Sequence, residues 1–347
     1  MKQALISKPD GISVVVCTYN GKERLTATLT SIFNQKTNNT FKWEVLLIDN
    51  ASTDGTKEFC IDLSIKIKNK FNHSFRIINE SNLGLNNARK KGLTESTYNW
   101  VLFCDDDNHL FDNYLQTGFD IISKHSSFGA LGGMGLPLFE IQKPEWFDEY
   151  AHSFAVGRQN SSNGKITYGN PEVYGAGCYY YKPILQKIFA TGYHTIMSDR
   201  KGKSLSSGGD IEWCYLLQIM NYEIWFSDEL KFYHLMPATR LTWDYYIKLK
   251  KGIANGRALL FSYIFYLKKE NTHPLFFLYN YFQYWAITCM VYLRLLLKIN
   301  LKVKNKKDKK IILALNILKA TAISFTKNLY ASYQHYKQIM QLVKNLN

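Results

Sequence analysis

The stretch that decides the fold is ISVVVCTYNG, residues 12–21. Its first six residues are rich in β-branched valine and isoleucine and contain no charge, which is typical of a strand buried on both faces of a parallel sheet. Asn20 and Gly21 then break the run, because both residue types favour turns. From Lys22 to Gln35 apolar residues recur at helical spacing. The stretch therefore predicts a strand followed by a helix.

The same unit recurs along the first third of the chain. WEVLLI at 43–48 predicts a second strand, and DNASTDG at 49–55 predicts a turn that leads into another helix. Residues 75–78 and 100–103 predict two more strands, with a helix at 85–93 between them. Strands that alternate with helices imply right-handed crossovers and a mostly parallel sheet. We therefore expect an α/β fold of the Rossmann-like kind, flanked by helices.

Polar residues follow three of these strands. They are Thr18–Asn20 after the first strand, Asp49–Asn50 after the second and Asp105–Asp107 after the fourth. In open α/β sheets, ligands bind beyond the carboxyl ends of the strands. Three adjacent carboxylates also repel one another, so a cation or water has to meet them. A solvated turn is the alternative for Asp105–Asp107, but three polar clusters at three strand ends favour a ligand site.

Charge divides the chain into two parts. The net charge is +15, and residues 240–347 hold 19 Lys and Arg against 3 Asp and Glu, whereas residues 1–239 hold 24 against 25. We therefore predict a near-neutral globular domain over 1–239 and a basic, aromatic-rich helical region over 240–347. Within the first domain, we expect a nucleotide-sugar half over about 1–110 and an acceptor half over about 111–239.

The cysteines and the first residues bear on the compartment. The six cysteines form no C-x-x-C pair, and two of them lie in apolar strand-like runs, which is typical of small core residues in a reducing compartment. The opening MKQALISKPDG has no apolar stretch of the kind found in secretory signals. These features predict a cytoplasmic protein.

The basic region contains an uncharged segment. Residues 271–293 include no Lys, Arg, Asp or Glu, and residues 298–310 are dominated by lysine. The segment is long enough to cross a bilayer, but Asn280, Gln283 and several tyrosines dilute it. A membrane-surface helix, a buried core helix and a span remain open. We expect a peripheral anchor on anionic lipid at the inner face of the plasma membrane. No nucleic-acid partner is expected, because no recognition motif accompanies the charge.

Five motifs together resemble those of glycosyltransferase family 2. They are VVVCTYNG, LLIDNASTDGT, NLGLNNARKKG, FCDDDN and GGDIEWC, and they cover about residues 12–235. The resemblance implies a GT-A fold, a nucleotide-diphospho-sugar donor (most commonly a UDP-sugar), a divalent metal (Mn²⁺ or Mg²⁺) and inversion at the anomeric carbon. The chain lacks the Q-x-x-R-W motif of processive polysaccharide synthases. We therefore expect transfer of one sugar to a glycan or lipid-linked acceptor in cell-surface polysaccharide or glycoconjugate assembly.

The aspartates resemble the family's D-x-D motif. The resemblance implies that Asp107 contacts the metal most directly, while Asp105 or Asp106 serves the ribose or a metal-bound water. Carboxylates suit this role, because hard divalent cations take oxygen ligands and neutralise the charge that develops on a diphosphate leaving group. His234 resembles a histidine that completes the metal or diphosphate site in many relatives. A structural role is its alternative.

The resemblance also assigns a nucleotide pocket. Asp49 resembles the aspartate that accepts a hydrogen bond from the nucleobase, although a turn or cap role is open to it. Arg89 is expected to meet the nucleotide or the diphosphate, and a solvated helix surface is its alternative. The residues assigned to the nucleotide-sugar site are Thr18, Tyr19, Asn20, Asp49, Asn82, Arg89, Asp105 and Asp106.

Asp210 is the candidate general base, which would accept the proton of the attacking acceptor hydroxyl. The family motif is usually Glu-Asp, but here glycine precedes the aspartate. Glu212 is an alternative carboxylate, and a helix cap is the structural alternative for Asp210. The missing glutamate leaves open a catalytically impaired nucleotide-sugar-binding protein. A sugar-nucleotidyltransferase is a weaker alternative, since CTYNGKE after the first strand is not a glycine-rich, basic phosphate loop.

Overall fold

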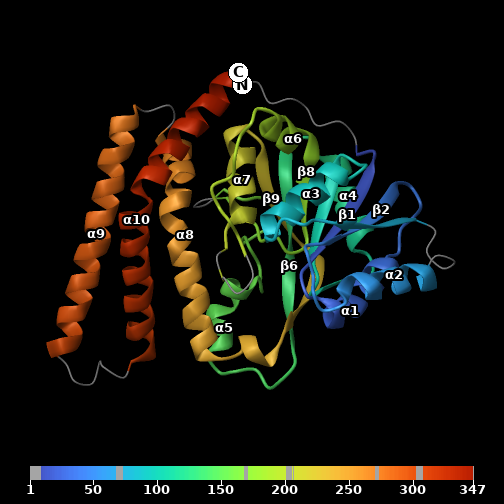
Figure 1. Cartoon of the computed structure of the whole chain (residues 1–347), viewed down its shortest axis with the longest axis horizontal. Helices are drawn as coiled ribbons and strands as arrows, with labels where there is room; N and C mark the ends of the chain where they lie inside the picture. Colours follow the sequence, from blue (N-terminus) through green and yellow to red (C-terminus); the bar gives the residue numbers. More distant parts are fainter. Residues whose placement is uncertain are drawn as a thin grey trace. The chain divides into compact units, whose positions relative to one another are not determined.

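A computed structural model describes residues 9–67, 73–167, 171–200, 205, 207–269, 273–301 and 308–346. The chain forms two compact units, coloured along the sequence in Figure 1. The first comprises Met1–Ala190 and Trp213–Ala238, and the second comprises Thr191–Glu212 and Thr239–Asn347. The second unit thus includes a segment, residues 191–212, that lies inside the predicted first domain. Contacts between this segment and the C-terminal helices include the hydrogen bonds of Tyr193 and Glu212 with Tyr263.

The first unit is built on one mixed sheet. Among the described residues the strand order is β3-β2-β1-β4-β8-β6-β9-β5, and β7 pairs with β9. The strands are β1 (Gly11–Thr18), β2 (Lys42–Asp49), β3 (Ser74–Asn79), β4 (Trp100–Asp105), β5 (Asn108–Leu110), β6 (Phe128–Phe139), β7 (Gly164–Lys165), β8 (Cys178–Tyr181) and β9 (Glu223–Met236).

The first four strands pair in parallel, as predicted. The second half differs, because β8 joins β4 and β6 in antiparallel fashion, while β6 and β9 run parallel. Every residue of β1 is buried, which agrees with a strand covered on both faces. The α/β class expected from the sequence is confirmed.

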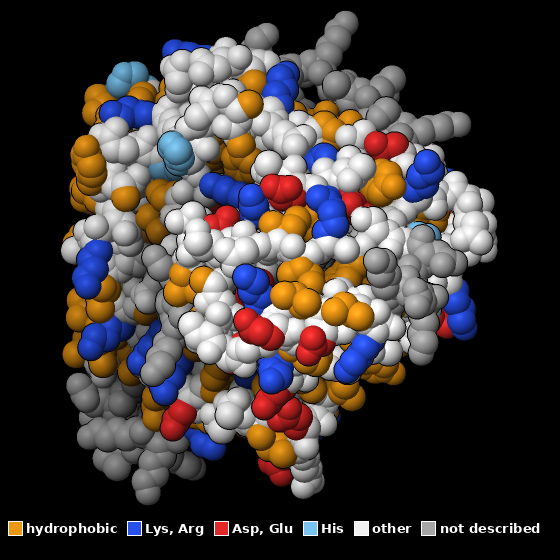
Figure 2. Space-filling view, turned by 45° about the vertical axis from the view of Figure 1, so that its right-hand side comes forward, with side chains coloured by type: hydrophobic (Ala, Val, Ile, Leu, Met, Phe, Trp, Pro, Cys, Tyr) orange, Lys and Arg blue, Asp and Glu red, His pale blue; other side chains and the backbone are white. Residues whose placement is uncertain are grey.

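Helices flank this sheet (Figure 1). Their bounds are α1 (Lys22–Phe33), α2 (Thr56–Ile67), α3 (Leu85–Glu95), α4 (Tyr114–Lys124), α5 (Phe147–Tyr150), α6 (Lys182–Ala190) and α7 (Gly209–Ile219), with 3-10 turns at Ala151–Phe154 and Ala238–Arg240. Gly92 lets α3 approach β1 closely, because a Cβ atom at this position would collide with the side chain of Val15. All six cysteines are free. On the face in Figure 2, acidic and basic side chains are interspersed.

The second unit is helical. It contains the first turn of α7 and three long helices, α8 (Trp243–Lys269), α9 (Pro274–Leu301) and α10 (Lys309–Leu346), with α10 packed against both α8 and α9. Within the described part of the chain, no helix combines the length and the apolarity needed to cross a membrane. Phe277 and Tyr281 of α9 are buried, whereas much of the rest of this helix is exposed. The helix is therefore only half-buried.

Candidate active site

The polar residues predicted at the strand ends lie along one edge of the sheet. Thr18 pairs with Asp49, Asp49 pairs with Asn79, and Cys17 pairs with Asp105 in the strand register. The strands β2 and β3 extend the sheet on one side of β1, and β4 lies on the other side. This reversal of strand order is a topological switch point, where open α/β sheets form a binding crevice at their carboxyl ends.

Asp106 joins helix α1 to the end of β4. Its Oδ2 atom accepts hydrogen bonds from Thr18 Oγ1 at 2.7 Å and Arg24 Nη2 at 2.8 Å, and its Oδ1 atom accepts one from Arg24 Nε at 3.1 Å. Thr28 Oγ1 donates to the Asp106 carbonyl oxygen at 2.9 Å. Burial raises the pKa of the Asp106 carboxyl. The Arg24 guanidinium lowers this pKa, whereas the negative charge of Asp107 raises it. The hydrogen bonds of Asp106 are thus made mainly to other residues of the protein, Thr18, Arg24 and Thr28.

Gly21 makes this arrangement sterically feasible. A Cβ atom at this position would collide with Thr18 Oγ1 and Asp106 Oδ2. The Gly21 amide also donates to Thr56 Oγ1 at 3.1 Å, so the turn after β1 is fixed from two sides. The Asn20-Gly21 break predicted from sequence therefore has a specific structural reason.

The loops after β1 and β2 bond to each other. Asn20 has a left-handed backbone with φ 49°. Its amide donates to Ser52 Oγ at 3.0 Å, and its Oδ1 atom accepts from the Thr53 amide at 2.8 Å. Asp49 is buried, and its Oδ1 atom accepts from the Ser52 amide at 3.2 Å. Tyr19 is 38% exposed beside this loop pair, so its ring is available to a ligand.

Asn50 fixes the loop after β3. Its Nδ2 atom donates to the carbonyl oxygen of Asn82 at 2.8 Å, and its Oδ1 atom accepts from the Gly84 amide at 2.7 Å. Helix α3 begins just beyond and carries Arg89, whose Nη2 atom lies 3.8 Å from Asp105 Oδ1. Arg89 is 5% exposed, so it is not a solvated surface residue.

Asp107 lies beside His234. The short strand β5 pairs with β9 so that Asn108 is opposite His234. The Asp107 carbonyl oxygen accepts from the Leu235 amide at 2.9 Å, and His234 Nε2 lies 3.4 Å from Asp107 Oδ1. Both side chains are less than a tenth exposed. Two of the three predicted metal ligands are therefore adjacent, while Asp105 is paired with Arg89.

The donor atoms at this point suit a divalent cation bound together with a ligand. Among the described residues, no three His, Cys, Asp or Glu side chains lie close enough to hold a metal by themselves. Asp107 and His234 nevertheless offer one carboxylate and one imidazole. Mg²⁺ and Mn²⁺ sites of this kind use one or two protein ligands and complete the shell with phosphate oxygens and water. The residues present fit such a cation.

The candidate base belongs to the second unit. Asp210 lies in the first turn of α7, and its Oδ1 atom accepts from the Ile211 amide at 2.9 Å. Glu212 is fully buried and accepts from the amides of Ile196 and Met197 and from Tyr263 Oη, at 2.7, 3.1 and 2.5 Å. Because the Glu212 carboxylate is buried and already accepts three hydrogen bonds, its role is structural. Asp210 therefore remains the candidate base on this helix.

Sequence reasoning missed three residues of this region. One is Arg24. Three adjacent aspartates require a cation, and the available signal was an arginine in the first turn of the helix after the first strand. The sequence indicates Gly21 only as a strand breaker, and Asn50 only as part of a polar cluster. Their roles depend on contacts between loops that are distant in the sequence.

Comparisons with known proteins identify the family and the fold of the chain. Glycosyltransferase GlyA of Streptococcus pneumoniae is 31% identical over 123 residues, which are 35% of this chain and 16% of GlyA. The cholesterol galactosyltransferase of Borreliella burgdorferi is 30% identical over 105 residues, which are 30% of this chain and 27% of that protein. The chain thus spans less than a third of the length of either relative.

One solved structure has the same fold across nearly the whole chain. It is a mannosyltransferase from Pyrobaculum calidifontis in complex with GDP-Man and Mn²⁺, with a TM-score of 0.53 and 17% identity over 95% of this chain and 90% of that one. At this identity the likeness concerns the fold alone. The family model for glycosyl transferase family 2 matches residues 13–189, about half of the sequence, and includes most of β1, all of β4 and the three aspartates. The chain belongs to glycosyl transferase family 2.

Proposed function

We propose that the protein is an inverting, metal-dependent and non-processive glycosyltransferase. It would move one sugar from a nucleotide-diphospho-sugar, most commonly a UDP-sugar, to a hydroxyl of a glycan or lipid-linked acceptor in cell-surface polysaccharide or glycoconjugate assembly. The observation that carries the proposal is the switch-point edge, where Thr18 pairs with Asp49, Asp105 pairs with the preceding Cys17, and Asp107 lies beside His234. Family membership supports the same reaction class.

The donor nucleotide would lie over the carboxyl ends of β1, β2 and β4. The buried Asp49 carboxylate would accept from the nucleobase, and the Tyr19 ring would pack on the base. Thr18 and Asn20 would hold the loops that shape the pocket, and the exposed Asn82 would border it. Arg89 with Asp105 would face the ribose or the diphosphate, and Asp106 would position α1 through Arg24.

Asp107 and His234 would hold Mn²⁺ or Mg²⁺ together with the donor diphosphate. When bound, the cation neutralises the charge that develops on the leaving diphosphate. The burial of both side chains fixes their orientation, and the Leu235 amide restrains the Asp107 main chain. Asp105 would act through ribose or metal-bound water.

The proton of the acceptor hydroxyl would go to the Asp210 carboxylate. Inversion requires this hydroxyl to attack the anomeric carbon opposite the leaving group, while a positioned base takes the proton. Asp210 fits because it is partly exposed at the start of a helix. A carboxylate there is also compatible with the helix dipole.

A donor panel tests the reaction. UDP-, GDP- and dTDP-sugars are each incubated with the full chain and Mn²⁺, and hydrolysis and transfer are measured. One donor class should react, and EDTA should abolish the reaction. Asp107→Asn should lower the rate by about 100-fold or more, whereas Asp210→Asn should abolish transfer but retain donor binding. The control Asp62→Asn changes an exposed aspartate on α2 and should leave the rate unchanged.

Other outcomes would assign the chain differently. Full activity in EDTA would remove the metal from the mechanism. Donor binding without hydrolysis or transfer would indicate the impaired nucleotide-sugar-binding protein, for which Gly209 in place of glutamate is the motivation. Formation of a nucleotide sugar from a sugar phosphate and a nucleoside triphosphate would indicate a nucleotidyltransferase.

The proposed location is the cytoplasm, peripheral at the inner face of the plasma membrane. The excess of basic over acidic residues in 240–347 supports attraction to anionic lipid. A lipid-linked acceptor would be present at that surface. The name of the Borreliella relative, a cholesterol galactosyltransferase, describes transfer to a lipid by a protein of similar sequence.

A further inference from the structure

Helix α9 exposes an apolar face. Of the 19 large apolar side chains exposed among the described residues, ten lie on this helix. At helical spacing, one face carries Leu275, Tyr279, Phe282, Met290, Leu293 and Leu297, which are between 47% and 65% exposed. The opposite face is buried at Phe277, Tyr281 and Thr288. Soluble proteins rarely leave so contiguous an apolar surface uncovered unless it binds something.

The chemistry around this face is strongly basic. Neither α9 nor α10 contains an Asp or Glu residue. Exposed cationic side chains on these two helices are Arg294, Lys298, Lys309, Lys310, Lys319, Lys327, Lys337 and Lys344. From Pro274 to Leu293, in contrast, α9 carries no charged side chain. The combination is an apolar helix face with cations near its C-terminal end and on the neighbouring helix.

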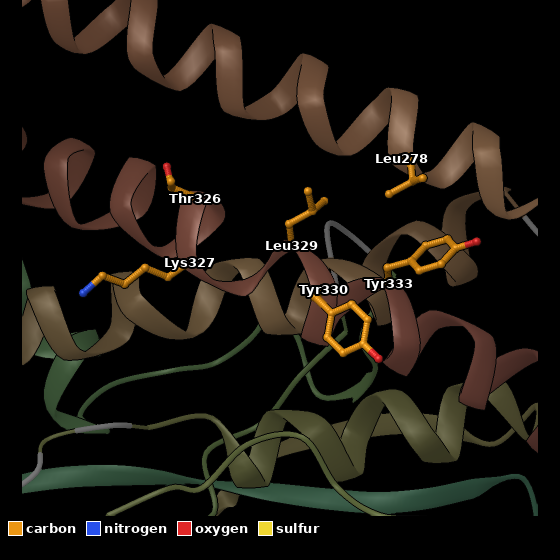
Figure 3. Close-up of a pocket in the computed structure, with 6 residues that line it drawn as sticks. All are labelled: Leu278, Thr326, Lys327, Leu329, Tyr330 and Tyr333. Atoms are coloured by element: carbon orange, nitrogen blue, oxygen red, sulfur yellow. The ribbon is translucent and has the colours of Figure 1, made fainter.

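A shallow groove connects the two features. It lies between α9 and α10, has a volume of about 380 Å³ and is lined by Leu278, Thr326, Lys327, Leu329, Tyr330 and Tyr333. In Figure 3, Lys327 is at one end of the groove and Leu278 with Tyr333 at the other, with Leu329 between them. Tyr330 is 75% exposed. The groove thus offers an apolar wall and one cation, which matches an acyl chain next to an anionic headgroup.

We propose that α9 and the adjoining groove form a docking surface for an anionic lipid bilayer. The helix would lie in the plane of the membrane, with Phe282 and Leu293 among the residues in the acyl–headgroup boundary and Lys327 at a lipid phosphate. Aromatic and basic side chains favour this boundary over the hydrocarbon core. A second copy of the chain is a poorer occupant, because it would bring an equally basic surface to the contact.

The inference rests on the proposed function in one respect, since the bilayer is where a lipid-linked acceptor would reside. Vesicle binding itself needs no donor, metal or acceptor. Vesicle binding is therefore measured separately from donor binding, and a negative result in one measurement does not contradict the other proposal.

The test is flotation of the full chain with vesicles of phosphatidylcholine alone or with about 30% phosphatidylglycerol. The chain should bind the anionic vesicles and lose affinity as salt is raised. Phe282→Gln with Leu293→Gln should weaken binding about tenfold or more, and Lys327→Gln about fivefold. The matched control, Ile61→Gln with Ile65→Gln, removes exposed apolar side chains from α2 and should bind as the unchanged chain does.

Three results would overturn the proposal. They are no binding of the unchanged chain to anionic vesicles, equal binding by the α9 double variant, and equal loss in the α2 control. A homodimer that the α9 double variant dissociates, with no vesicle binding, would assign the face to a second copy. An unchanged urea unfolding transition in every variant shows that a loss of vesicle binding is not a loss of fold.

Discussion

The Nε2 atom of His234 lies 3.4 Å from the Oδ1 atom of Asp107, and both side chains are buried. The contact exists because the short strand β5, directly after the aspartates, pairs with β9. A carboxylate and an imidazole held in this way present two donor atoms to one point. We therefore expect that loss of either side chain weakens metal-dependent donor binding.

His234→Ala should weaken metal-dependent donor binding about 10- to 100-fold, the range seen when a metal site loses one supporting group. Titration of Mn²⁺ at fixed donor concentration measures the change. His125→Ala alters an exposed histidine on the first unit and serves as the control. Equal Mn²⁺ dependence in the two variants would show that His234 has a structural role only.

Arg24→Met should destabilise the first unit by about 1–3 kcal/mol, because it leaves the Asp106 carboxylate without its charged donor. Burial already raises the pKa of this carboxyl, so loss of the cation should raise it further. Urea unfolding at neutral pH measures the free energy. Lys124→Met, on the exposed end of α4, should change it by less than about 0.5 kcal/mol.

Gly21→Ala should cost about 1–3 kcal/mol, the range typical of an added methyl group in a closely packed site, and should weaken donor binding. The new Cβ atom would displace Thr18 or Asp106, which together fix the ends of β1 and β4. Unfolding and nucleotide-sugar binding are measured on the same preparation. The neighbouring Lys22→Ala affects an exposed side chain, and a comparable loss there would refute the steric argument.

The first four strands could be predicted because each is a short apolar run that ends in a turn signal. Because parallel strands end at the same edge of a sheet, the polar residues after these strands could be expected to lie close together. The proximity of Asp49 to Thr18 was predictable for this reason. The Asp107–His234 contact depends on a three-residue strand and could be expected only from family resemblance. The Arg24–Asp106 pair requires a turn geometry that spacing does not encode.

The second half was less predictable for a different reason. Strands β6, β8 and β9 meet across long separations, and their antiparallel and parallel pairings have no local signal. The grouping of residues 191–212 with the C-terminal helices involves contacts between residues remote in sequence, among them the hydrogen bond between Glu212 and Tyr263.

Tyr263→Phe tests that cluster. Tyr263 donates to the buried Glu212 carboxylate at 2.5 Å, and its oxygen lies 2.6 Å from the Tyr193 hydroxyl. The variant should destabilise the second unit by about 1–3 kcal/mol, because a buried charged acceptor loses a donor. Tyr330→Phe removes a hydroxyl from a 75% exposed tyrosine and should be neutral in the same urea titration.

The same cluster predicts a pH dependence. Tyr193 Oη lies 2.8 Å from His335 Nε2, Ser262 Oγ lies 2.7 Å from Nδ1, and the Glu212 carboxylate is 4.0 Å away. Burial lowers the pKa of His335 from 6.5 to about 3. The folded chain therefore keeps this imidazole neutral, while the unfolded chain takes up a proton below a pH of about 6.5. Stability should fall as the pH drops through that value and continue to fall toward about 3.

Between about pH 7 and about pH 5, His335 alone should remove about 2 kcal/mol from the free energy of unfolding. Other groups titrate over this range, so the measured quantity is the difference between the unchanged chain and His335→Gln. The glutamine variant is less stable at neutral pH but should lose about 2 kcal/mol less on acidification. Parallel pH profiles for the two proteins would mean that His335 takes up its proton at the same pH in the folded and unfolded chain, and would contradict a pKa lowered by burial.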